Sequence, residues 1–443
     1  MNSKTLSLTL LLACLAAPFA LADDWPQWMG PTRDGVLRET GLVESIPADG
    51  LKVNWRVPIA GGYSGPAVAG GRVFVTDFVK ESGEAFNDPG KRSDLAGKER
   101  VLCFDAATGK ELWKHEYDCP YSVSYPAGPR TTPTVDGDHV YTLGCEGDLI
   151  CLSVQSGDVV WQRSFKKDFT AGVPIWGHSA HPLVHGDKLI CMVGGENHAV
   201  VAFNKTTGKE IWSALSVPDV GYCPPSIIKA GGTEQLLIWH PKSVVSLNPE
   251  DGSQYWDEPL EPGYGMSIAR PQRSGDMLYT CGIGGKSLML KLASDKPAVE
   301  EVWVGNSKNS VFCANSTPLL VDDVIYGVDC QVGFMVAAKT QDGTRLWESY
   351  EPTTRGTRRA SHGTAFITKS GEQFFLFSEL GDLIIADINA EKYSERGRFH
   401  VLEPTQECFG RKVIWSHPAY ANKQLFARND KELVSISLDA SQY

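Results

Sequence analysis

The chain has 443 residues, of which 53 are Asp or Glu and 42 are Lys or Arg, giving a net charge of −11. This acidic balance argues against a phosphate-binding surface, so we expect no nucleic-acid partner. Beyond the N-terminus, no segment approaches the roughly 20 consecutive apolar residues that a membrane-spanning helix needs. We therefore expect no transmembrane segment.

Residues 1–22 are typical of a secretory signal peptide. Lys4 supplies a positive charge, residues 6–17 are apolar, and a small-x-small cleavage site ends at Ala22. The mature protein is therefore expected in the periplasm, beginning with an N-terminal extension over 23–50. The Leu-Leu-Ala-Cys run ending at Cys14 also resembles a lipobox, which would instead tether a lipidated protein to a membrane.

A short phrase, Gly-x-x-x-Trp, recurs along the chain at intervals of 44 to 51 residues. Self-similarity at this period, with four short strands per unit, predicts a β-propeller. The glycine accepts the positive φ of a tight turn, and the indole is expected to lie over the next blade with its N–H on a backbone carbonyl. We assign a structural role to the whole set, including two tryptophans without the glycine: Gly109, Trp113, Gly157, Trp161, Gly208, Trp212, Gly252, Trp256, Gly343, Trp347, and Trp303 and Trp55.

The units predict an all-β, eight-bladed propeller of four-stranded antiparallel blades over 51–443. Seven units run from about 63 to 403, and the seventh is degenerate, with Arg398-Phe399 where the tryptophan would be. The last unit, 413–443, lacks a fourth strand. The segment 51–59 carries Trp55 and has no preceding strands, so we expect it to complete the last blade and to close the ring.

The phrase Ala-x-Thr-Gly-Lys-x-x-Trp resembles the PQQ-type propeller repeat shared by quinoprotein alcohol dehydrogenases and the outer-membrane assembly lipoprotein BamB. The opening DWPQWMGPTRDGVLRETGL (24–42) resembles the N-terminal signature of secreted PQQ-like repeat proteins of planctomycete-type bacteria. The resemblance covers nearly the whole mature chain. Because the family holds both enzymes and non-catalytic scaffolds, it implies the fold much more than the function.

The chain departs from the quinoprotein dehydrogenases in several ways. It has no adjacent cysteine pair and no Cys-x-x-Cys-His haem site, and the calcium-binding Glu/Asn/Asp set of those enzymes cannot be matched to positions here. These departures weigh against PQQ as a cofactor. The leading hypothesis is thus an exported, non-catalytic binding or scaffold propeller, and the alternative is a PQQ-dependent oxidoreductase.

Candidate ligand-binding residues lie just before the proline that opens each innermost strand, where a propeller's loops face its central channel. Several are cationic, titratable or aromatic: Arg130, Trp176, His178, His181, Arg270, His362, Trp415 and His417. They predict a cationic mouth that would focus its field on a small anionic ligand. The opposing interpretation is that these side chains hydrogen-bond loop carbonyls and water.

Other patterns leave alternatives open. Trp176 and Trp415 could act as stacking platforms of a sugar-binding protein, and a protein partner is a further option. The His178-x-x-His181 pair and His417 could ligate zinc or copper, but no Cys or carboxylate lies at a convincing spacing, so we expect no metal site. We also expect a monomer. No catalytic constellation was found. In an oxidising compartment, Cys119–Cys145 and Cys313–Cys330 are candidate disulfides.

Overall fold

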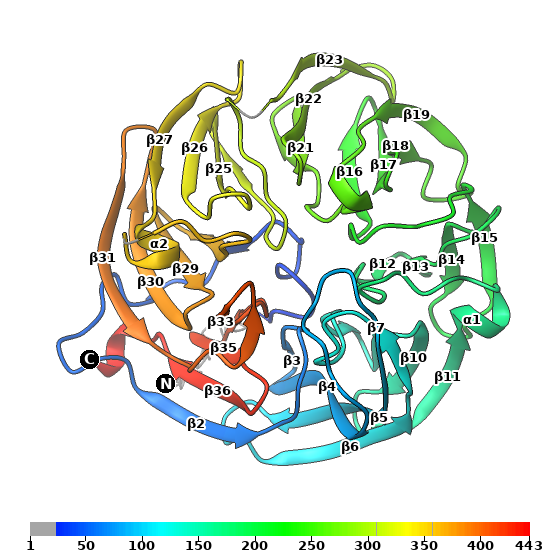
Figure 1. Ribbon diagram of the computed structural model, residues 1–443, viewed down its shortest axis with the longest axis horizontal. Coiled ribbons are helices and arrows are strands. Elements are labelled where there is room, and N and C mark those ends of the chain that lie inside the picture. Colours follow the sequence, from blue (N-terminus) through cyan, green and yellow to red (C-terminus); the bar gives the residue numbers. More distant parts are fainter. Residues whose placement is uncertain (1–23, 307, 357) are drawn as a thin grey trace, which may run out of the picture.

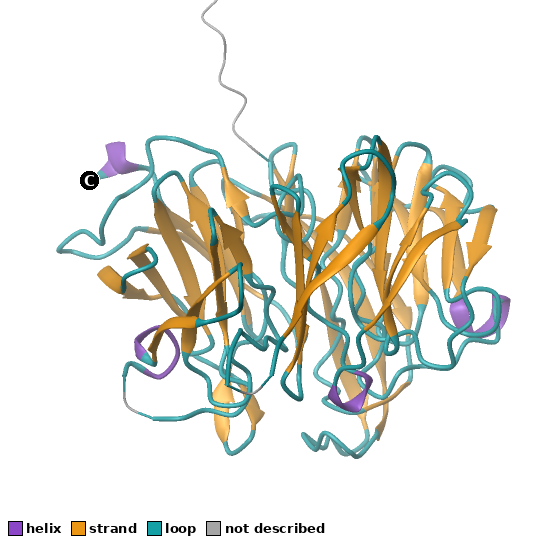
Figure 2. Ribbon diagram, turned by 90° about the horizontal axis from the view of Figure 1, so that it is seen from above, coloured by secondary structure: helices purple, strands orange, loops and turns teal. Residues whose placement is uncertain are grey.

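The computed structural model describes residues 24–306, 308–356 and 358–443. In this part of the chain, eight antiparallel four-stranded sheets surround a central axis, as Figure 1 shows. Seen from the edge, the ring is a thick disc with its loops on the two flat faces (Figure 2). The predicted eight-bladed, all-β propeller is confirmed.

The first four blades follow the chain in order, from the innermost strand outward. Their strands are β3 (Ala67–Ala69), β4 (Arg72–Ser82), β5 (Ser93–Asp105) and β6 (Glu111–Asp118); β8 (Thr134–Asp136), β9 (His139–Leu143), β10 (Asp148–Ser153) and β11 (Val159–Ser164); β12 (Leu183–His185), β13 (Lys188–Met192), β14 (Val200–Asn204) and β15 (Glu210–Ala214); and β16 (Ser226–Ala230), β17 (Thr233–Trp239), β18 (Ser243–Leu247) and β19 (Gln254–Pro259).

The next three blades repeat the same order. Their strands are β20 (Gln272–Ser274), β21 (Met277–Gly282), β22 (Lys286–Leu292) and β23 (Val299–Val304); β24 (Leu319–Val321), β25 (Val324–Val328), β26 (Met335–Lys339) and β27 (Arg345–Ser349); and β28 (Ala365–Ser370), β29 (Gln373–Ser378), β30 (Asp382–Ile388) and β31 (Tyr393–His400). The short helices and additional strands are α1 (Phe165–Asp168), α2 (Glu351–Thr354), η1 (Gly263–Gly265), η2 (Ala440–Gln442), β1 (Val36–Leu37), β7 (Tyr121–Val123), and the hairpin β32 (Gln406–Cys408) with β33 (Arg411–Val413).

The eighth blade joins the two ends of the propeller. Its inner strands are β34 (Ala419–Ala421), β35 (Gln424–Arg428) and β36 (Glu432–Ser437), and its outer strand is β2 (Val53–Pro58), antiparallel to β36. The predicted closure of the ring by an N-terminal strand is therefore confirmed. Pairing β2 with β36 covers an edge that would otherwise expose unpaired N–H and C=O groups.

Middle and outer strands differ in pattern because their surroundings differ. The middle strand β13 is buried along its whole length, as expected for a strand covered on both faces by neighbouring blades. In the outer strand β6, Trp113 alone is buried and the other residues are exposed or half-buried. Hydrophobic clusters accordingly lie between blades, each drawing residues from two or more neighbouring sheets.

The recurring tryptophans join consecutive blades. The indole N–H of Trp113 donates to the carbonyl of Val154 at 2.9 Å, and that of Trp161 to the carbonyl of Lys205 at 2.9 Å. A Cβ placed on Gly208 would lie 2.7 Å from Cδ2 of Trp161, so only glycine leaves room for the ring. The contact also requires the turn to have a φ of +66° at this glycine.

The degenerate seventh blade uses a different ring for the same contact. Phe399, on its outer strand β31, packs against Gly50, the glycine that precedes β2 in the eighth blade. On the other side, the indole N–H of Trp347 donates to the carbonyl of Asn389 in the seventh blade at 2.8 Å. These two contacts join the seventh blade to both of its neighbours, although its sequence does not contain the Gly-x-x-x-Trp motif.

The N-terminal extension crosses the centre of the ring before it reaches β2 (Figure 1). Trp25 exchanges two backbone hydrogen bonds of 2.8 Å with Val68 of the first blade. β1 then pairs in parallel with β28 of the seventh blade. The extension is thus tied to blades on both sides of the centre, and its residues lie in the central channel.

Candidate functional site

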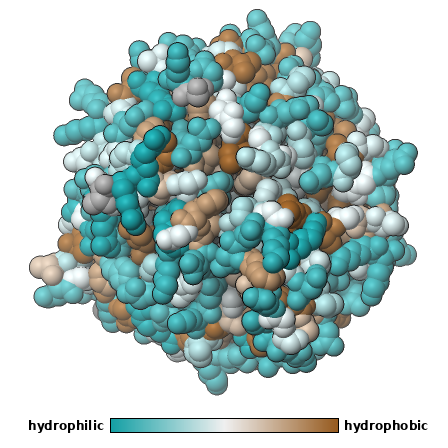
Figure 3. All heavy atoms as spheres, in the orientation of Figure 1, coloured by the Kyte–Doolittle hydropathy of each residue, from teal (hydrophilic) through white to brown (hydrophobic). Residues whose placement is uncertain are grey.

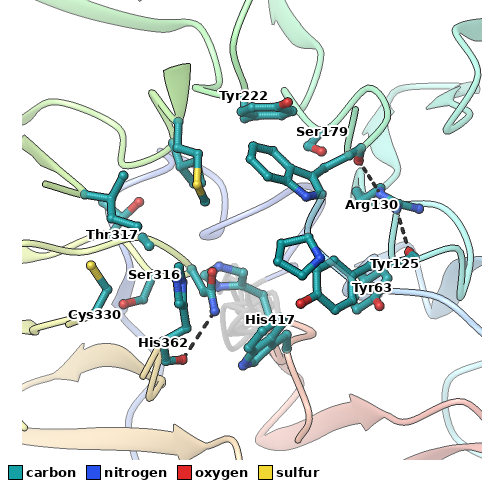
Figure 4. A pocket seen from close by; sticks show the side chains of 18 of the residues that line it. Tyr63, Tyr125, Arg130, Ser179, Tyr222, Ser316, Thr317, Cys330, His362 and His417 are labelled. Atoms are coloured by element: carbon teal, nitrogen blue, oxygen red, sulfur yellow. Dashed lines mark hydrogen bonds between the residues drawn. The ribbon is translucent and has the colours of Figure 1, made fainter. Parts of the chain in front are cut away.

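A cavity of about 760 Å³ lies at the centre of the propeller. Its rim includes Phe409, in the β32–β33 turn, and Tyr264 of η1, whose side chains are 46% and 84% exposed. Figure 3 shows one face of the disc, where a hydrophilic rim surrounds apolar residues that gather toward the centre. Figure 4 shows the cavity from close by, with side chains from many blades converging on it.

Trp28 of the N-terminal extension forms the inner end of the cavity. Its side chain is buried, stacks on the imidazole of His181 with ring centroids 4.9 Å apart, and meets His417 edge to face at 5.7 Å. The indole nitrogen Nε1 has no hydrogen-bond partner among the described residues. The extension therefore supplies the floor of the cavity, although this buried nitrogen does not reach the cavity surface.

Two buried arginines fix this floor in place. The guanidinium of Arg33 donates to the carbonyls of His181, Pro182 and Pro225, which belong to the third and fourth blades. Arg270 of the fifth blade in turn donates through Nη1 to the carbonyl of Arg33 at 2.6 Å. Burial and the neighbouring Arg270 lower the pKa of Arg33 to about 9, which leaves it charged at neutral pH.

Aromatic rings from the first to fourth blades form one side of the cavity. Tyr63 precedes β3, Tyr125 follows β7, and Trp176 and Tyr222 lie in the loops before β12 and β16. The rings of Trp176 and Tyr222 contact each other with centroids 5.6 Å apart. Such rings offer wide apolar faces at a small cost in conformational entropy.

Arg130 lies behind this aromatic side and is held by backbone carbonyls. Its guanidinium donates to the carbonyls of Trp176, Ser124, Tyr125 and Gly128, at 2.7 to 2.9 Å for the first three. It also lies over the ring of Tyr63, 5.1 Å from the centroid. Most of its N–H groups are therefore committed within the protein.

Neutral hydroxyl and amide side chains form the facing side. Asn315, Ser316 and Thr317 precede β24, Gln331 follows β25, and Ser361 precedes β28. In Figure 4, Ser316 and Thr317 lie across the cavity from Tyr222, Tyr125 and Tyr63. The fifth and sixth blades also contribute apolar and thiol side chains to the lining, those of Met266, Ile268, Ile283, Ala314 and Cys330. The cavity thus has one aromatic side and one hydroxyl–amide side that is partly apolar.

A second aromatic cluster stands at the rim. The imidazole of His362 stacks on Phe409 with centroids 4.9 Å apart and planes inclined by 4°, and Trp415 lies nearby at 6.5 Å. The carboxylate of Glu379 accepts from Nε of Arg411 at 2.7 Å and from the indole N–H of Trp415 at 3.4 Å. This ion pair helps to orient Trp415.

The histidines of the site are uncharged at neutral pH. Burial lowers the pKa of His417 to about 3, and burial with the nearby Arg411 lowers that of His362 to about 4. Burial, then the charges of Arg33 and His417, also hold the pKa of His181 well below its usual range. Among the described residues that line the cavity, none is Asp, Glu or Lys, and Arg130 is the one permanently charged side chain.

Six of the eight predicted ligand residues line the cavity: Arg130, Trp176, His181, His362, Trp415 and His417. Arg270 lies outside the lining and holds the extension. His178 is buried against Phe165, 5.2 Å away and edge to face, and burial lowers its pKa to about 3. The mouth is therefore less cationic than the sequence predicted, because burial keeps the histidines neutral and carbonyls occupy the arginines.

The sequence analysis missed most of the aromatic lining and the whole floor. Trp28 and Arg33 lie in the extension, which was treated as a family signature only, and Tyr63, Tyr125 and Tyr222 lie in loops between blades. One signal was available: residues 25–28 contain two tryptophans in a segment with no strand pattern, and such rings need a buried site.

Neither candidate disulfide is present in the structure. The ten cysteines among the described residues are all buried free thiols, including Cys119, Cys145, Cys313 and Cys330. The backbone N–H of Cys313 instead donates to the sulfur of Cys281 at 3.5 Å. The expected bridges rested on repeat positions alone, which bring Cys119 and Cys145 into one hydrophobic cluster without a bond between them.

Three further observations bear on the expectations from sequence. In the described part of the chain, no helix is long and apolar enough to cross a membrane. Within the same residues, no three His, Cys, Asp or Glu side chains are grouped so that they could hold a metal ion. The signal peptide and Cys14 lie outside the described residues.

Comparisons with known proteins identify relatives of two kinds. The sequence model of a family described as outer membrane protein assembly factor BamB matches residues 97–349, more than half of the chain. Quinohemoprotein alcohol dehydrogenase ADH IIB of Pseudomonas putida is 28% identical over 167 residues, covering 35% of this chain and 21% of that protein. Quinoprotein alcohol dehydrogenase PedH of Pseudomonas putida is 26% identical over 193 residues, covering 37% and 32%. The chain thus matches less than a third of the length of these two enzymes.

The similar solved structures are also of two kinds, BamB and quinohemoprotein alcohol dehydrogenase. BamB from Moraxella catarrhalis superimposes with a TM-score of 0.53 at 15% identity, covering 81% of this chain and 97% of that one. The quinohemoprotein alcohol dehydrogenase from Comamonas testosteroni superimposes with a TM-score of 0.56 at 13% identity, covering 94% and 80%. At such identities the likeness shows a shared fold.

Proposed function

Because this chain belongs to the family of the outer membrane protein assembly factor BamB, we propose that it is an exported, non-catalytic binding propeller that holds a small ligand in its central cavity. One observation carries the proposal: a central cavity of about 760 Å³ that is lined by aromatic rings and by a few neutral polar side chains. Cavities of this size with aromatic walls and a few convergent polar groups are typical of small-molecule sites.

The residues support a neutral ligand better than the small anionic ligand that the sequence suggested. An anion needs cations with free N–H groups, but Arg130 directs its guanidinium at backbone carbonyls. The lowered pKa values of His181, His362 and His417 remove the other positive charges at neutral pH. A carboxylate moved into such a cavity would lose hydration that the walls do not replace.

The lining does not fit PQQ with a calcium ion, which an oxidoreductase of the quinoprotein type would require. A hard cation needs carboxylate and amide oxygens, and the described lining residues include no Asp or Glu, with Asn315 and Gln331 as the amides. The similarity to quinoprotein alcohol dehydrogenases is the reason to retain a PQQ-dependent oxidoreductase as the alternative function. We therefore derive no redox step, and we test the alternative directly.

The deciding experiment identifies any small molecule that the cavity retains when the protein is purified. The mature protein would be purified from its exporting host, unfolded, and its released small molecules identified by mass spectrometry. Ser179→Trp places an indole in the cavity, and Ser156→Trp, in an exposed turn of the second blade, is the matched control. A molecule held by wild type and Ser156→Trp but lost from Ser179→Trp supports the proposal, whereas equal retention by both variants contradicts it.

A titration with PQQ, with and without calcium, tests the alternative. We expect no saturable binding in the micromolar range, because the lining offers neither free cations nor a carboxylate. Saturable binding with a quinone absorption band, abolished by Ser179→Trp, would overturn the non-catalytic proposal and would justify a screen of alcohol and sugar substrates.

Export rests on residues 1–22, with their charged start, apolar stretch and cleavage site. Cell fractionation with an antibody to the propeller tests it. We expect the mature form in the periplasmic fraction, and retention of an uncleaved form in the cytoplasm would contradict export. A mature N-terminus at Cys14 would identify the lipoprotein alternative.

A further inference from the structure

The two facing sides of the cavity call for two different properties in one ligand. The aromatic side, with Tyr63, Trp176 and Tyr222, offers apolar faces. The opposite side offers Ser316 and Gln331, a hydroxyl and an amide that both donate and accept hydrogen bonds. It also offers the side-chain oxygen of Asn315, whose Nδ2 already donates to the carbonyl of His362 and to Oγ1 of Thr364. A ligand that fills the space must therefore present an apolar face on one side and several hydroxyl or carbonyl groups on the other.

The floor adds neutral ring surface. Trp28, Thr132 and His181 line the cavity. Nδ1 of His181 accepts the backbone N–H of Thr132 at 2.9 Å, so in the neutral ring the proton lies on Nε2. Nε1 of Trp28 and Oγ1 of Thr132 have no hydrogen-bond partner among the described residues, but both atoms are fully buried and do not reach the cavity surface. The floor is therefore uncharged and offers rings to a ligand.

The charges of the lining residues further restrict the chemical class of the ligand. With no Asp, Glu or Lys in the described lining and with Arg130 bound to carbonyls, a charged ligand would find no counter-charge. A flat aromatic compound without hydroxyls would satisfy the rings, but it would leave the hydroxyl of Ser316 and the amide of Gln331 unpaired. Unpaired buried polar groups oppose binding more strongly than a missing apolar contact.

We propose that the ligand of the central cavity is a short, uncharged saccharide, whose C–H faces stack on the aromatic side and whose hydroxyls bond the hydroxyl–amide side. This inference rests on the proposed binding function and names the ligand class of that same site. Phe409 and Tyr264 expose their rings at the rim, so a longer chain continues outward from the cavity over these two rings.

The experiment is a glycan array that carries both neutral and acidic saccharides, followed by isothermal titration of the mature protein with the best ligand, starting with maltotriose, cellotriose and chitotriose. We expect saturable binding to a neutral saccharide. Trp176→Ala, which removes a ring from the aromatic side, should weaken it at least tenfold, and Trp415→Ala, which removes a lining ring at the rim, should weaken it less. Tyr443→Ala removes an exposed ring outside the cavity and should bind as wild type does.

Two outcomes would overturn the inference, and they differ in what they say of the proposed function. If no neutral saccharide binds while an acidic saccharide or 1,4-naphthoquinone binds and is excluded by Ser179→Trp, the saccharide class is wrong and the binding function stands. If neither the array nor the molecules released from the purified protein show any ligand that Ser179→Trp excludes, both proposals fail. Because Trp176→Ala could disturb folding, its melting temperature is measured alongside, and Trp176→Phe gives a second, milder probe of the same aromatic lining.

Discussion

The indole of Trp28 lies parallel to the imidazole of His181, with ring centroids 4.9 Å apart and planes inclined by 12°. The stack encloses one face of the histidine, and its Nδ1 already accepts the backbone N–H of Thr132. Protonating this ring would break that hydrogen bond and bury a charge beside Arg33. The N-terminal extension therefore fixes the protonation state of the site as well as its shape.

Acid should destabilise the protein well above the pH at which its carboxylates titrate. His178 and His417 have pKa values of about 3 when folded, against a usual value of about 6.5. Between these pH values the unfolded chain binds more protons, so stability is fully present above about pH 6.5 and falls as the pH decreases toward 3. Each of the two rings should lower the free energy of unfolding by about 1.4 kcal/mol between pH 7.5 and pH 5.5.

Urea unfolding at pH 7.5 and pH 5.5 measures this difference. In His417→Gln the drop between the two pH values should be smaller by about 1.4 kcal/mol. Phe366→Leu is the control, because this ring contacts His417 at 3.9 Å but does not titrate. It should lower stability equally at both pH values. A drop that is the same in wild type and His417→Gln would show that the buried histidine is not the cause.

Arg33 should contribute much more to stability than its neighbours in the extension. Replacing it by Met removes the donors of three buried carbonyls, those of His181, Pro182 and Pro225. Hydrogen bonds from charged groups contribute about 1.5–3 kcal/mol each, so we expect a loss of about 3 kcal/mol or more. The floor should also loosen, which would be measured as increased acrylamide quenching of tryptophan fluorescence.

Arg38→Met is the matched control in the same segment. Arg38 is exposed and forms an ion pair with Asp34 at 2.5 Å, and exposed pairs of this kind contribute about 1 kcal/mol or less. Its quenching should equal that of wild type. If Arg33→Met and Arg38→Met unfold at the same urea concentration, Arg33 does not hold the extension in the channel.

The fold could be predicted from the sequence because its main contacts recur. Each Gly-x-x-x-Trp phrase marks a turn and the outer strand that follows it, so Trp113 and Trp161 locate their blades without knowledge of distant contacts. Even the missing fourth strand of the last blade could be paired with the segment around Trp55 by counting strands. The site does not recur in this way, because each blade contributes a different side chain at the centre.

The cavity's chemistry depended on contacts between segments far apart in the sequence. Position before a recurring proline placed His181 and His417 correctly at the centre, but both rings are kept neutral by burial, to which Trp28 from the extension contributes. In the same way, Arg130 looked available for an anion until Trp176 and Tyr125 placed their carbonyls around it. Burial and hydrogen bonding of this kind leave no trace in residue spacing.

The contact between Gly208 and Trp161 should tolerate no side chain at the glycine. In Gly208→Ala the new Cβ would lie 2.7 Å from Cδ2 and Cε3 of Trp161, at a φ of +66°. Gly137 is the control, because it has a φ of +56° and nothing within 4 Å of an added Cβ. Gly137→Ala should cost about 1 kcal/mol for backbone strain alone, whereas Gly208→Ala should approach the loss of about 3–5 kcal/mol expected for Trp161→Ala.

Thermal and urea unfolding of the three variants distinguish the two sources of strain. Equal effects of Gly208→Ala and Gly137→Ala would mean that the indole does not press on the glycine. An unchanged melting curve for Trp161→Ala would likewise contradict a role for this ring in joining the second and third blades.

Removing β2 should open the ring. A chain that begins at residue 59 leaves β36 without its outer neighbour, exposing a row of N–H and C=O groups from Glu432 to Ser437, and it also lacks the floor that Trp28 provides. Exposed edges of this kind pair with other chains. We expect the truncated protein to elute as larger species in size-exclusion chromatography, and adding a synthetic peptide of residues 24–59 should restore the elution volume of the full chain.

A peptide of the same composition in scrambled order is the control, since only the native order places Trp55 over Gly109 and its N–H on the carbonyl of Ala106. If the truncated chain elutes and melts as the full chain does, β2 is not the strand that holds the propeller closed.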